Sequence, residues 1–159
     1  MKKILIAIAV VASAIMANAA CVNWKAANVY GSDLTTKLAV GSEVALYGAL
    51  VTTEGVGEYT KLDTFTLTAA GTIGKVTSDV FTADDVYNFY FTFTDGTKQF
   101  TSATKESVTI KAVGDTQVAF GNMTSATQNP SNWASVPEPT SGLLMLLGMA
   151  GLALKRKRD

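Results

Sequence analysis

Few residue types in this chain could do catalytic chemistry, because the sequence contains no histidine. That absence removes serine–histidine–aspartate and cysteine–histidine catalysis, together with the commonest metal ligand. A serine–lysine dyad or a pair of carboxylates remains open. The acidic residues are scattered, however, and the adjacent Asp84 and Asp85 would point to opposite sides of an extended segment. We therefore predict no enzymatic activity, no catalytic residue and no cofactor.

Two kinds of binding site can still be assembled from the composition. Asp79, Asp84 and Asp85 offer oxygen ligands for calcium, but their spacing fits no loop signature, and we expect no metal site. The aromatic side chains that could stack on sugar rings are Trp24, Tyr30, Tyr47, Tyr59 and Trp133. They suggest, as an alternative function, a carbohydrate-binding module for extracellular polysaccharide. The competing interpretation places Trp24 in the core and Trp133 near a membrane interface.

The most informative spacing lies at the C-terminal end. Pro137, Glu138 and Pro139 precede an apolar run at 140–154, and a basic cluster follows it. Proline fixes φ and donates no backbone hydrogen bond, so the two prolines keep Glu138 in an extended segment. The apolar run can satisfy its backbone in lipid only as a helix. The cations of the basic stop stay on the cytoplasmic side; they are Lys155, Arg156, Lys157 and Arg158.

The predicted transmembrane helix is short against the roughly 20 residues that a span needs. Its residues are Thr140, Ser141, Gly142, Leu143, Leu144, Met145, Leu146, Leu147, Gly148, Met149, Ala150, Gly151, Leu152, Ala153 and Leu154. Snorkelling by Lys155 and Arg156 lengthens the segment that lipid can accept. We expect a weakly held inner-membrane anchor, which suits a tail that is meant to be removed.

These three parts, in this order, resemble the PEP-CTERM sorting signal of exported proteins of Gram-negative bacteria. The resemblance covers roughly residues 136–159. It implies recognition by an exosortase, a membrane-embedded cysteine protease or transpeptidase that removes the tail and passes the protein toward the cell surface or extracellular matrix. The plainer alternative is an ordinary C-terminal membrane anchor, in which the Pro-Glu-Pro sequence is accidental.

The N-terminal end has the pattern of a secretory signal peptide. A positive start, an apolar run at 4–15 and small residues at Ala17 and Ala19 predict a signal helix of 19 residues. Signal peptidase would cut after Ala19 and leave Ala20 as the new terminus, once the Sec translocon has exported the chain. The alternatives are a lipoprotein acylated at Cys21 and an uncleaved N-terminal anchor.

Export changes the charge of the protein. Two of the 13 basic residues lie in the signal peptide and four in the tail, whereas only Asp159 of the 13 acidic residues is lost. Seven basic and 12 acidic residues remain, a formal net charge of −5. No basic patch survives, so we expect no nucleic-acid partner.

The body, residues 20–122, is rich in Thr, Val, Phe, Tyr and Gly, which favours strands. Short strands with turns at regular spacing predict an all-β fold, an antiparallel β-sandwich. Within it we expect an edge strand at 22–30, a central strand at 44–51 and one helical turn at 78–85. Residues 123–135 are polar and contain proline, so we predict a linker between the body and the tail.

The clearest predicted element is a hairpin around Asp95 and Gly96. The preceding strand alternates so that four aromatic residues share one face: Tyr87, Phe89, Phe91 and Phe93. An Asp-Gly pair favours a two-residue turn, because both positions tolerate positive φ. That turn would place Phe91 directly opposite Phe100.

Overall fold

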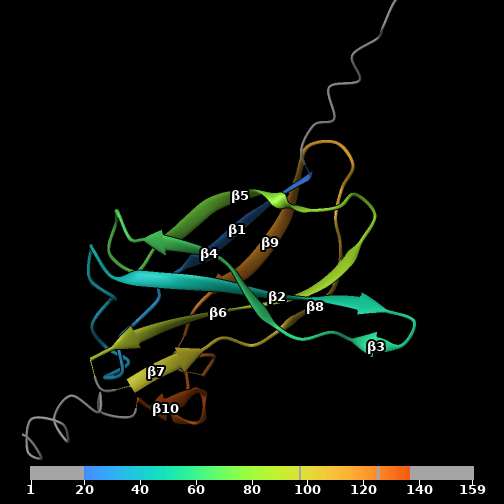
Figure 1. The fold of residues 1–159 in the computed structure, drawn as a ribbon. Coiled ribbons are helices and arrows are strands. Elements are labelled where there is room, and N and C mark those ends of the chain that lie inside the picture. The colour runs from blue at the N-terminus through green and yellow to red at the C-terminus, as the bar shows by residue number, and fades with distance from the viewer. Residues whose placement is uncertain (1–19, 97, 125, 137–159) are drawn as a thin grey trace, which may run out of the picture.

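The computed structural model describes residues 20–96, 98–124 and 126–136, and these residues form an all-β body, as predicted (Figure 1). The strands are β1 (Ala20–Ala27), β2 (Glu43–Thr52), β3 (Gly55–Val56), β4 (Thr60–Thr66), β5 (Ile73–Phe81), β6 (Val86–Asp95), β7 (Lys98–Thr101), β8 (Lys105–Thr109), β9 (Asp115–Asn122) and β10 (Trp133–Ser135). A short 3-10 helix, η1 (Pro130–Asn132), precedes β10. The predicted signal helix and transmembrane helix lie outside the described residues. Within the described part of the chain, no helical segment has the length and hydropathy of a membrane span.

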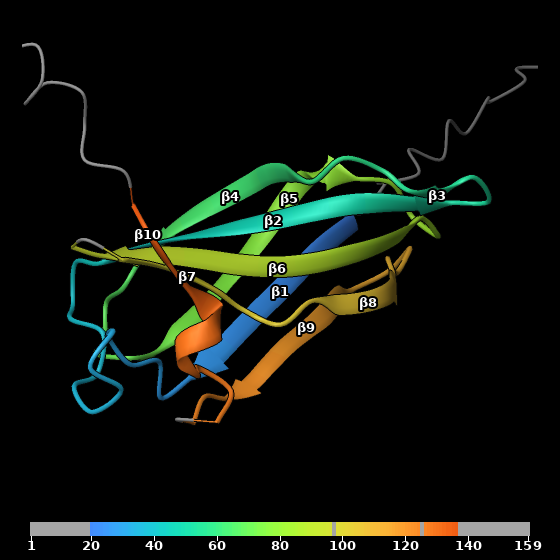
Figure 2. The ribbon, with the colours of Figure 1, turned by 90° about the horizontal axis from the view of Figure 1, so that it is seen from below.

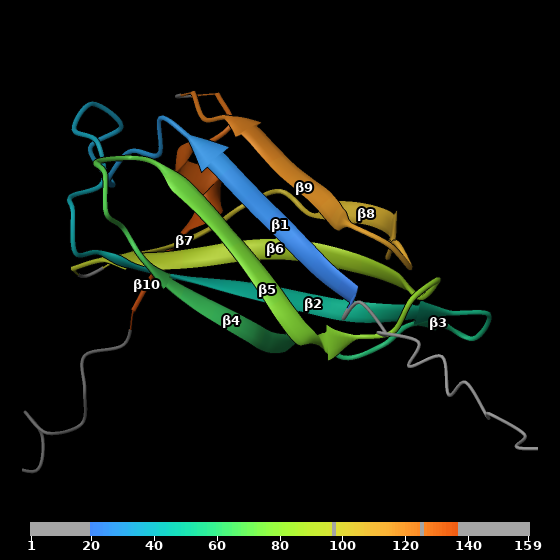
Figure 3. The ribbon, with the colours of Figure 1, turned by 90° about the horizontal axis from the view of Figure 1, so that it is seen from above.

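The strands form two sheets. The smaller has the order β5-β1-β9, and the larger has the order β10-β7-β6-β2-β3, with β4 also paired to β2 and β8 to β6. In Figure 2 the larger sheet lies in front of the smaller one, and in Figure 3, seen from the opposite side, the smaller sheet lies in front and crosses the larger one. The strand pairs of the larger sheet are antiparallel, but β1 and β9 run parallel. The antiparallel prediction is therefore wrong for that one pair.

Two local predictions about the smaller sheet are also wrong. The strand expected at an edge is β1, which lies in the middle between β5 and β9. The helical turn expected at 78–85 is in fact the end of β5 and the turn after it. Val76, Thr77 and Val80 are β-branched, and their preference for extended backbone outweighs the capping potential of the neighbouring hydroxyls.

Side chains of both sheets meet in one core. From the smaller sheet Val22, Trp24 and Ala26 alternate inward along β1, while β2 and β6 supply most of the opposite wall. The fully buried large side chains include Trp24, Leu46, Leu67, Ile73, Phe89, Phe91, Phe100 and Ile110. Phe89, Phe91 and Phe93 are buried and Tyr87 packs against them, so the predicted single aromatic face of β6 is confirmed.

The hairpin between β6 and β7 forms as predicted, but its register differs by two residues. Asp95 pairs with Lys98, so the turn begins at Gly96, which takes a φ of 61°. Phe100 therefore stands opposite Phe93, with ring centroids 5.1 Å apart. Asp95 stays in the strand, where its carboxylate accepts a hydrogen bond from the Ser32 amide at 2.6 Å. A slip of two residues keeps each side chain on its face.

The segment predicted as a linker, residues 123–135, belongs to the body. The Met123 amide bonds to the Ala27 carbonyl at 2.8 Å. Gln128 is completely buried and clamps the backbone of Tyr30, accepting from its amide at 2.8 Å and donating to its carbonyl at 2.9 Å. β10 then pairs with β7. Polarity and proline content predicted a linker. Composition alone cannot show that a glutamine is buried and satisfies backbone hydrogen-bonding groups.

We predict that the stability of the body depends strongly on Phe91, at the centre of the aromatic face of β6. Phe91→Ala should lower the free energy of unfolding by about 3–5 kcal/mol, because the ring is fully buried against Phe100 and Phe120 and leaves a cavity. Val113→Ala, at a side chain that is 73% exposed, should change it by no more than about 0.5 kcal/mol. Urea unfolding of the exported body measures both, and equal effects would contradict this assignment of the core.

Candidate functional site

Two of the acidic residues considered from the sequence for catalysis or metal binding, Asp84 and Asp85, make backbone hydrogen bonds that hold a turn. Asp84 lies in the turn after β5 with a φ of 67°, and its amide donates to the Ile110 carbonyl at 2.9 Å. The Ile110 amide returns a bond to the Asp85 carbonyl at 2.8 Å. These backbone bonds tie the turn to the segment after β8. The described residues contain no cluster of acidic or cysteine side chains that could hold a metal ion, and the Asp79 side chain lies outside what is described.

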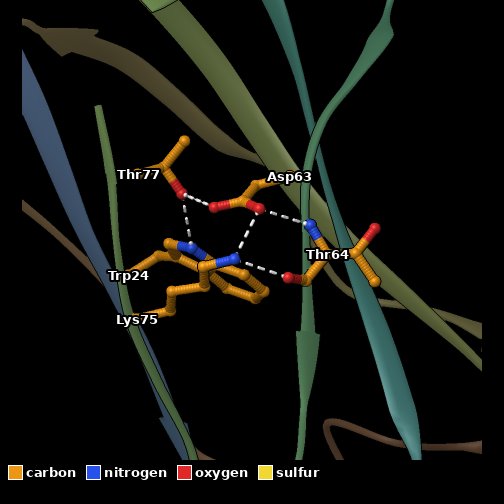
Figure 4. Close-up of polar contacts among 5 residues, drawn as sticks. All are labelled: Trp24, Asp63, Thr64, Lys75 and Thr77. Atoms are coloured by element: carbon orange, nitrogen blue, oxygen red, sulfur yellow. Dashed lines mark hydrogen bonds and ion pairs between the residues drawn. The ribbon is translucent and has the colours of Figure 1, made fainter. Parts of the chain in front are cut away.

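A connected group of polar side chains joins the two sheets at the β4–β5 edge (Figure 4). Lys75 of β5 reaches Asp63 of β4 at 2.6 Å and also donates to the Thr64 carbonyl at 2.7 Å. The Thr77 hydroxyl donates to the other Asp63 oxygen and accepts from the Trp24 indole at 3.1 Å. Trp24, Thr77, Asp63 and Lys75 are called the inter-sheet network below. It runs from the buried indole to a partly exposed ion pair.

The electrostatics of this network explain why Asp63 stays charged. Burial disfavours the carboxylate, but hydrogen bonds from Lys75, Thr77 and the Thr64 amide, with the charge of Lys75, outweigh burial and hold the pKa of Asp63 below its ordinary value. Both carboxylate oxygens are engaged by neighbouring groups. The arrangement is that of a structural tie, since a general base needs a free oxygen directed at a substrate.

Cys21 is likewise bound, through its thiol, to a neighbouring carboxylate. Its thiol donates to an Asp115 oxygen at 3.0 Å, and Asn23 donates to the other oxygen at 3.3 Å. The hydrogen bond to Asp115, then burial and the negative charge of Asp115, raise the pKa of the Cys21 thiol. The thiolate is the nucleophilic form, so this environment disfavours nucleophilic chemistry at Cys21.

The five aromatic residues considered for sugar binding separate in the structure. Trp24 is completely buried, and the half-buried Trp133 packs on Phe93 and Phe100 with ring centroids 5.5 and 5.4 Å away. Tyr47 and Tyr59 both pack against one further aromatic ring on the outer face of the larger sheet.

A third tyrosine, which the sugar-binding argument missed, joins that pair. Tyr90 stacks on Tyr47 with ring centroids 5.1 Å apart, and Tyr59 lies 4.9 Å from it on a tilt. These three half-buried rings are called the tyrosine cluster below. Burial, then the two neighbouring tyrosines, raise the pKa of Tyr90. The alternation along β6 could have revealed it, because Tyr90 lies between residues assigned to the inner face.

The described chain ends beside β7. In β10, Trp133 pairs with Phe100, Ala134 with Gln99 and Ser135 with Lys98, and β10 forms the edge of the larger sheet. The Trp133 indole donates to the Gln128 carbonyl at 3.2 Å. A cavity of about 140 Å³ lies beside this strand; Ser32, Leu34, Lys98, Pro130, Trp133 and Ser135 line it.

The residues that follow match a known protein-sorting signal. Residues 135–158 match the family described as the PEP-CTERM protein-sorting motif, so the chain carries this motif at its C-terminal end, as the resemblance predicted. The match supports an exported protein that an exosortase processes. Comparison with curated proteins and with solved structures gave no match.

For several predicted site residues, the sequence is the only source of information. Pro137, Glu138 and Pro139, the apolar run 140–154 and the basic stop 155–158 fall within the matched range but outside the described residues. At the other end Ala19 is not described, whereas Ala20 begins β1 and is 8% exposed. Cleavage between these two alanines stays a prediction.

The inter-sheet network predicts an acid-sensitive contribution to stability. Because the pKa of Asp63 is lowered by folding, its stabilisation is complete above the unfolded-state value of about 3.9 and is lost as the pH falls through the folded-state pKa. Asp63→Asn should thus be less stable than the wild type at pH 7 and lose less stability on acidification below about pH 4.

Urea unfolding at a series of pH values checks this prediction. Glu54→Gln, at an exposed turn between β2 and β3, controls for the loss of one negative charge. Parallel pH curves for Asp63→Asn and the wild type would show that the ion pair contributes nothing to acid sensitivity.

Proposed function

We propose that this chain is a cell-envelope or extracellular-matrix protein that is exported, held transiently in the inner membrane and released by an exosortase. The observation that carries the proposal is the match of residues 135–158 to the PEP-CTERM protein-sorting motif. Sec-dependent export and signal peptidase cleavage after Ala19 complete the route. The end state is a body at the cell surface or in the matrix.

Each part of the tail has a distinct physical task in this scheme. The basic stop halts translocation, since four cations do not cross a bilayer cheaply. The apolar run holds the chain in the membrane as a helix. Pro137 and Pro139 keep the segment before the helix extended, which is the form that a protease cleft binds through unpaired backbone groups.

A passive role for the body, without catalysis, agrees with its chemistry. Every buried side-chain nitrogen and oxygen among the described residues has a hydrogen-bond partner. Asp63 and Cys21, two groups with shifted pKa values, are held by neighbouring side chains rather than directed into a cleft. The body therefore resembles a structural unit that the tail delivers.

We predict that two sets of substitutions in the tail cause two separable defects, one in membrane retention and one in release. Replacing Lys155 to Arg158 with neutral residues should reduce membrane retention, because translocation is no longer stopped. Replacing Pro137 to Pro139 with alanines should preserve anchoring and block release, because alanine lets the helix extend into the recognition segment.

Fractionation into membrane, surface and medium measures both defects, in cells with and without the exosortase. The wild type should shorten and leave the membrane only when the enzyme is present. A wild-type chain that stays full-length and membrane-bound beside an active exosortase would contradict the proposal and favour a plain anchor.

A second candidate function is binding of extracellular polysaccharide at the tyrosine cluster. The observation that favours it is the gathering of Tyr47, Tyr59 and Tyr90 on the outer face of the larger sheet, away from the core. Phenol rings stack on the apolar faces of sugars, and their hydroxyls offer hydrogen bonds.

The tyrosine cluster gives a direct test of this candidate. Tyr47→Ala with Tyr59→Ala should abolish retention on the organism's own polysaccharide and leave the fold intact, whereas Tyr30→Ala, outside the cluster, should retain it. Affinity electrophoresis measures the retention. Trp24→Ala is unsuitable, because loss of a fully buried indole costs about 3–5 kcal/mol of stability. Equal retention of the double variant and the wild type would rule the cluster out.

A further inference from the structure

β10 is both the last strand of the body and the entrance to the sorting motif. The matched residues begin at Ser135, which is the final residue of β10. Val136 alone separates that strand from Pro137. The chain thus provides no spacer between the folded sheet and the Pro-Glu-Pro segment.

The pairing of β10 conflicts with what a protease needs. A cleft binds several residues of extended substrate through their backbone groups, and it must surround them. For a cut near Pro137, the residues on the N-terminal side of the bond are those of β10, which pair with β7 from Trp133 to Ser135. A strand lying in the edge of a sheet cannot enter a cleft at the same time.

We propose, resting on the exosortase processing proposed above, that β10 is part of the segment that the exosortase binds. It must leave β7 before the motif is cut. Trp133 is then a positioning residue, because its packing sets how often β10 is free.

The way β10 is attached fits a strand that can leave. It occupies the sheet edge, with a partner on one side only, and Ala134 and Ser135 are exposed. Trp133 alone among its residues packs on the core. The cavity of about 140 Å³ beside it means that one flank of the strand lacks close packing.

The chain just before β10 is held much more firmly. The buried Gln128 makes two hydrogen bonds to the backbone of Tyr30. Between Gln128 and Trp133 lies η1, whose first residue is Pro130 and which buries no side chain. Separation can therefore stop at η1, which leaves the rest of the body folded while β10 enters the protease.

A disulfide between β7 and β10 tests the proposal. Gln99 and Ala134 stand directly opposite each other, where antiparallel strands bring Cβ atoms to about 4.5–5.5 Å, close to the range that a disulfide spans. Their side chains alternate with those of Phe100 and Trp133, so the bridge lies away from the core. We would build Gln99→Cys with Ala134→Cys in a Cys21→Ser background, which removes the native thiol.

The assay uses the full-length protein in membranes that contain the exosortase, with the cut fraction followed by gel and mass spectrometry. The Cys21→Ser parent should be cut. The oxidised double variant should be cut many-fold more slowly, and reduction should restore the parent rate. Ala134→Cys alone should behave as the parent. A flexible Gly-Ser segment inserted between Ser135 and Val136 should restore cutting of the oxidised variant, because the cleft can then bind the insert.

Loss of the Trp133 anchor should have the opposite effect. Trp133→Ala should be cut several-fold faster than the wild type and Trp133→Phe to an intermediate extent, with circular dichroism confirming that each body stays folded. Equal rates for the oxidised double variant and its parent would overturn the inference, as would an oxidised variant that the insert does not rescue. Absence of cutting in the parent itself would instead refute the proposed exosortase processing.

Discussion

The body depends on how two crossed sheets are kept together without a covalent link. One cysteine excludes an intrachain disulfide, so burial and hydrogen bonding must hold the layers. Trp24 fills the space between them, and a buried indole N–H requires an acceptor. The Thr77 hydroxyl supplies that acceptor and in turn donates a hydrogen bond to Asp63 on the other sheet. The inter-sheet network thus lets the largest core residue be buried and fixes the relative position of β4 and β5.

The face of each strand could be predicted from the sequence, because alternation is a local property. Along β6 it placed Phe89, Phe91 and Phe93 inward. Neighbours in the sheet could not be predicted in the same way. β1 has β5 and β9 as partners, and they come from distant parts of the chain, so nothing near residue 24 indicates a middle position or a parallel pair.

The register of the β6–β7 hairpin and the burial of Gln128 could not be predicted from the sequence, for related reasons. Slipping the hairpin by two residues preserves every face, so the pattern cannot choose between Phe91 and Phe93 as the partner of Phe100. The observed register keeps Asp95 in the strand, where it accepts a hydrogen bond from Ser32, a residue too far away in sequence for the pattern to reveal. Gln128 lies in a polar segment that resembles a linker, and its bonding partner Tyr30 is distant in sequence. At the tail, by contrast, the motif was readable because its parts are contiguous and act by their own chemistry.

The body and the tail have different relations to the membrane. The body between the predicted cleavage site and the apolar run has a formal charge of −5, so an anionic lipid surface does not attract it. Large apolar side chains of both sheets are buried in one core, and among the described residues no helix is long and apolar enough to span a membrane. In the function proposed above, retention in the membrane comes from the tail. If the proposals above hold, one cut releases the body, and β10, the strand next to that cut, controls when the cut can occur.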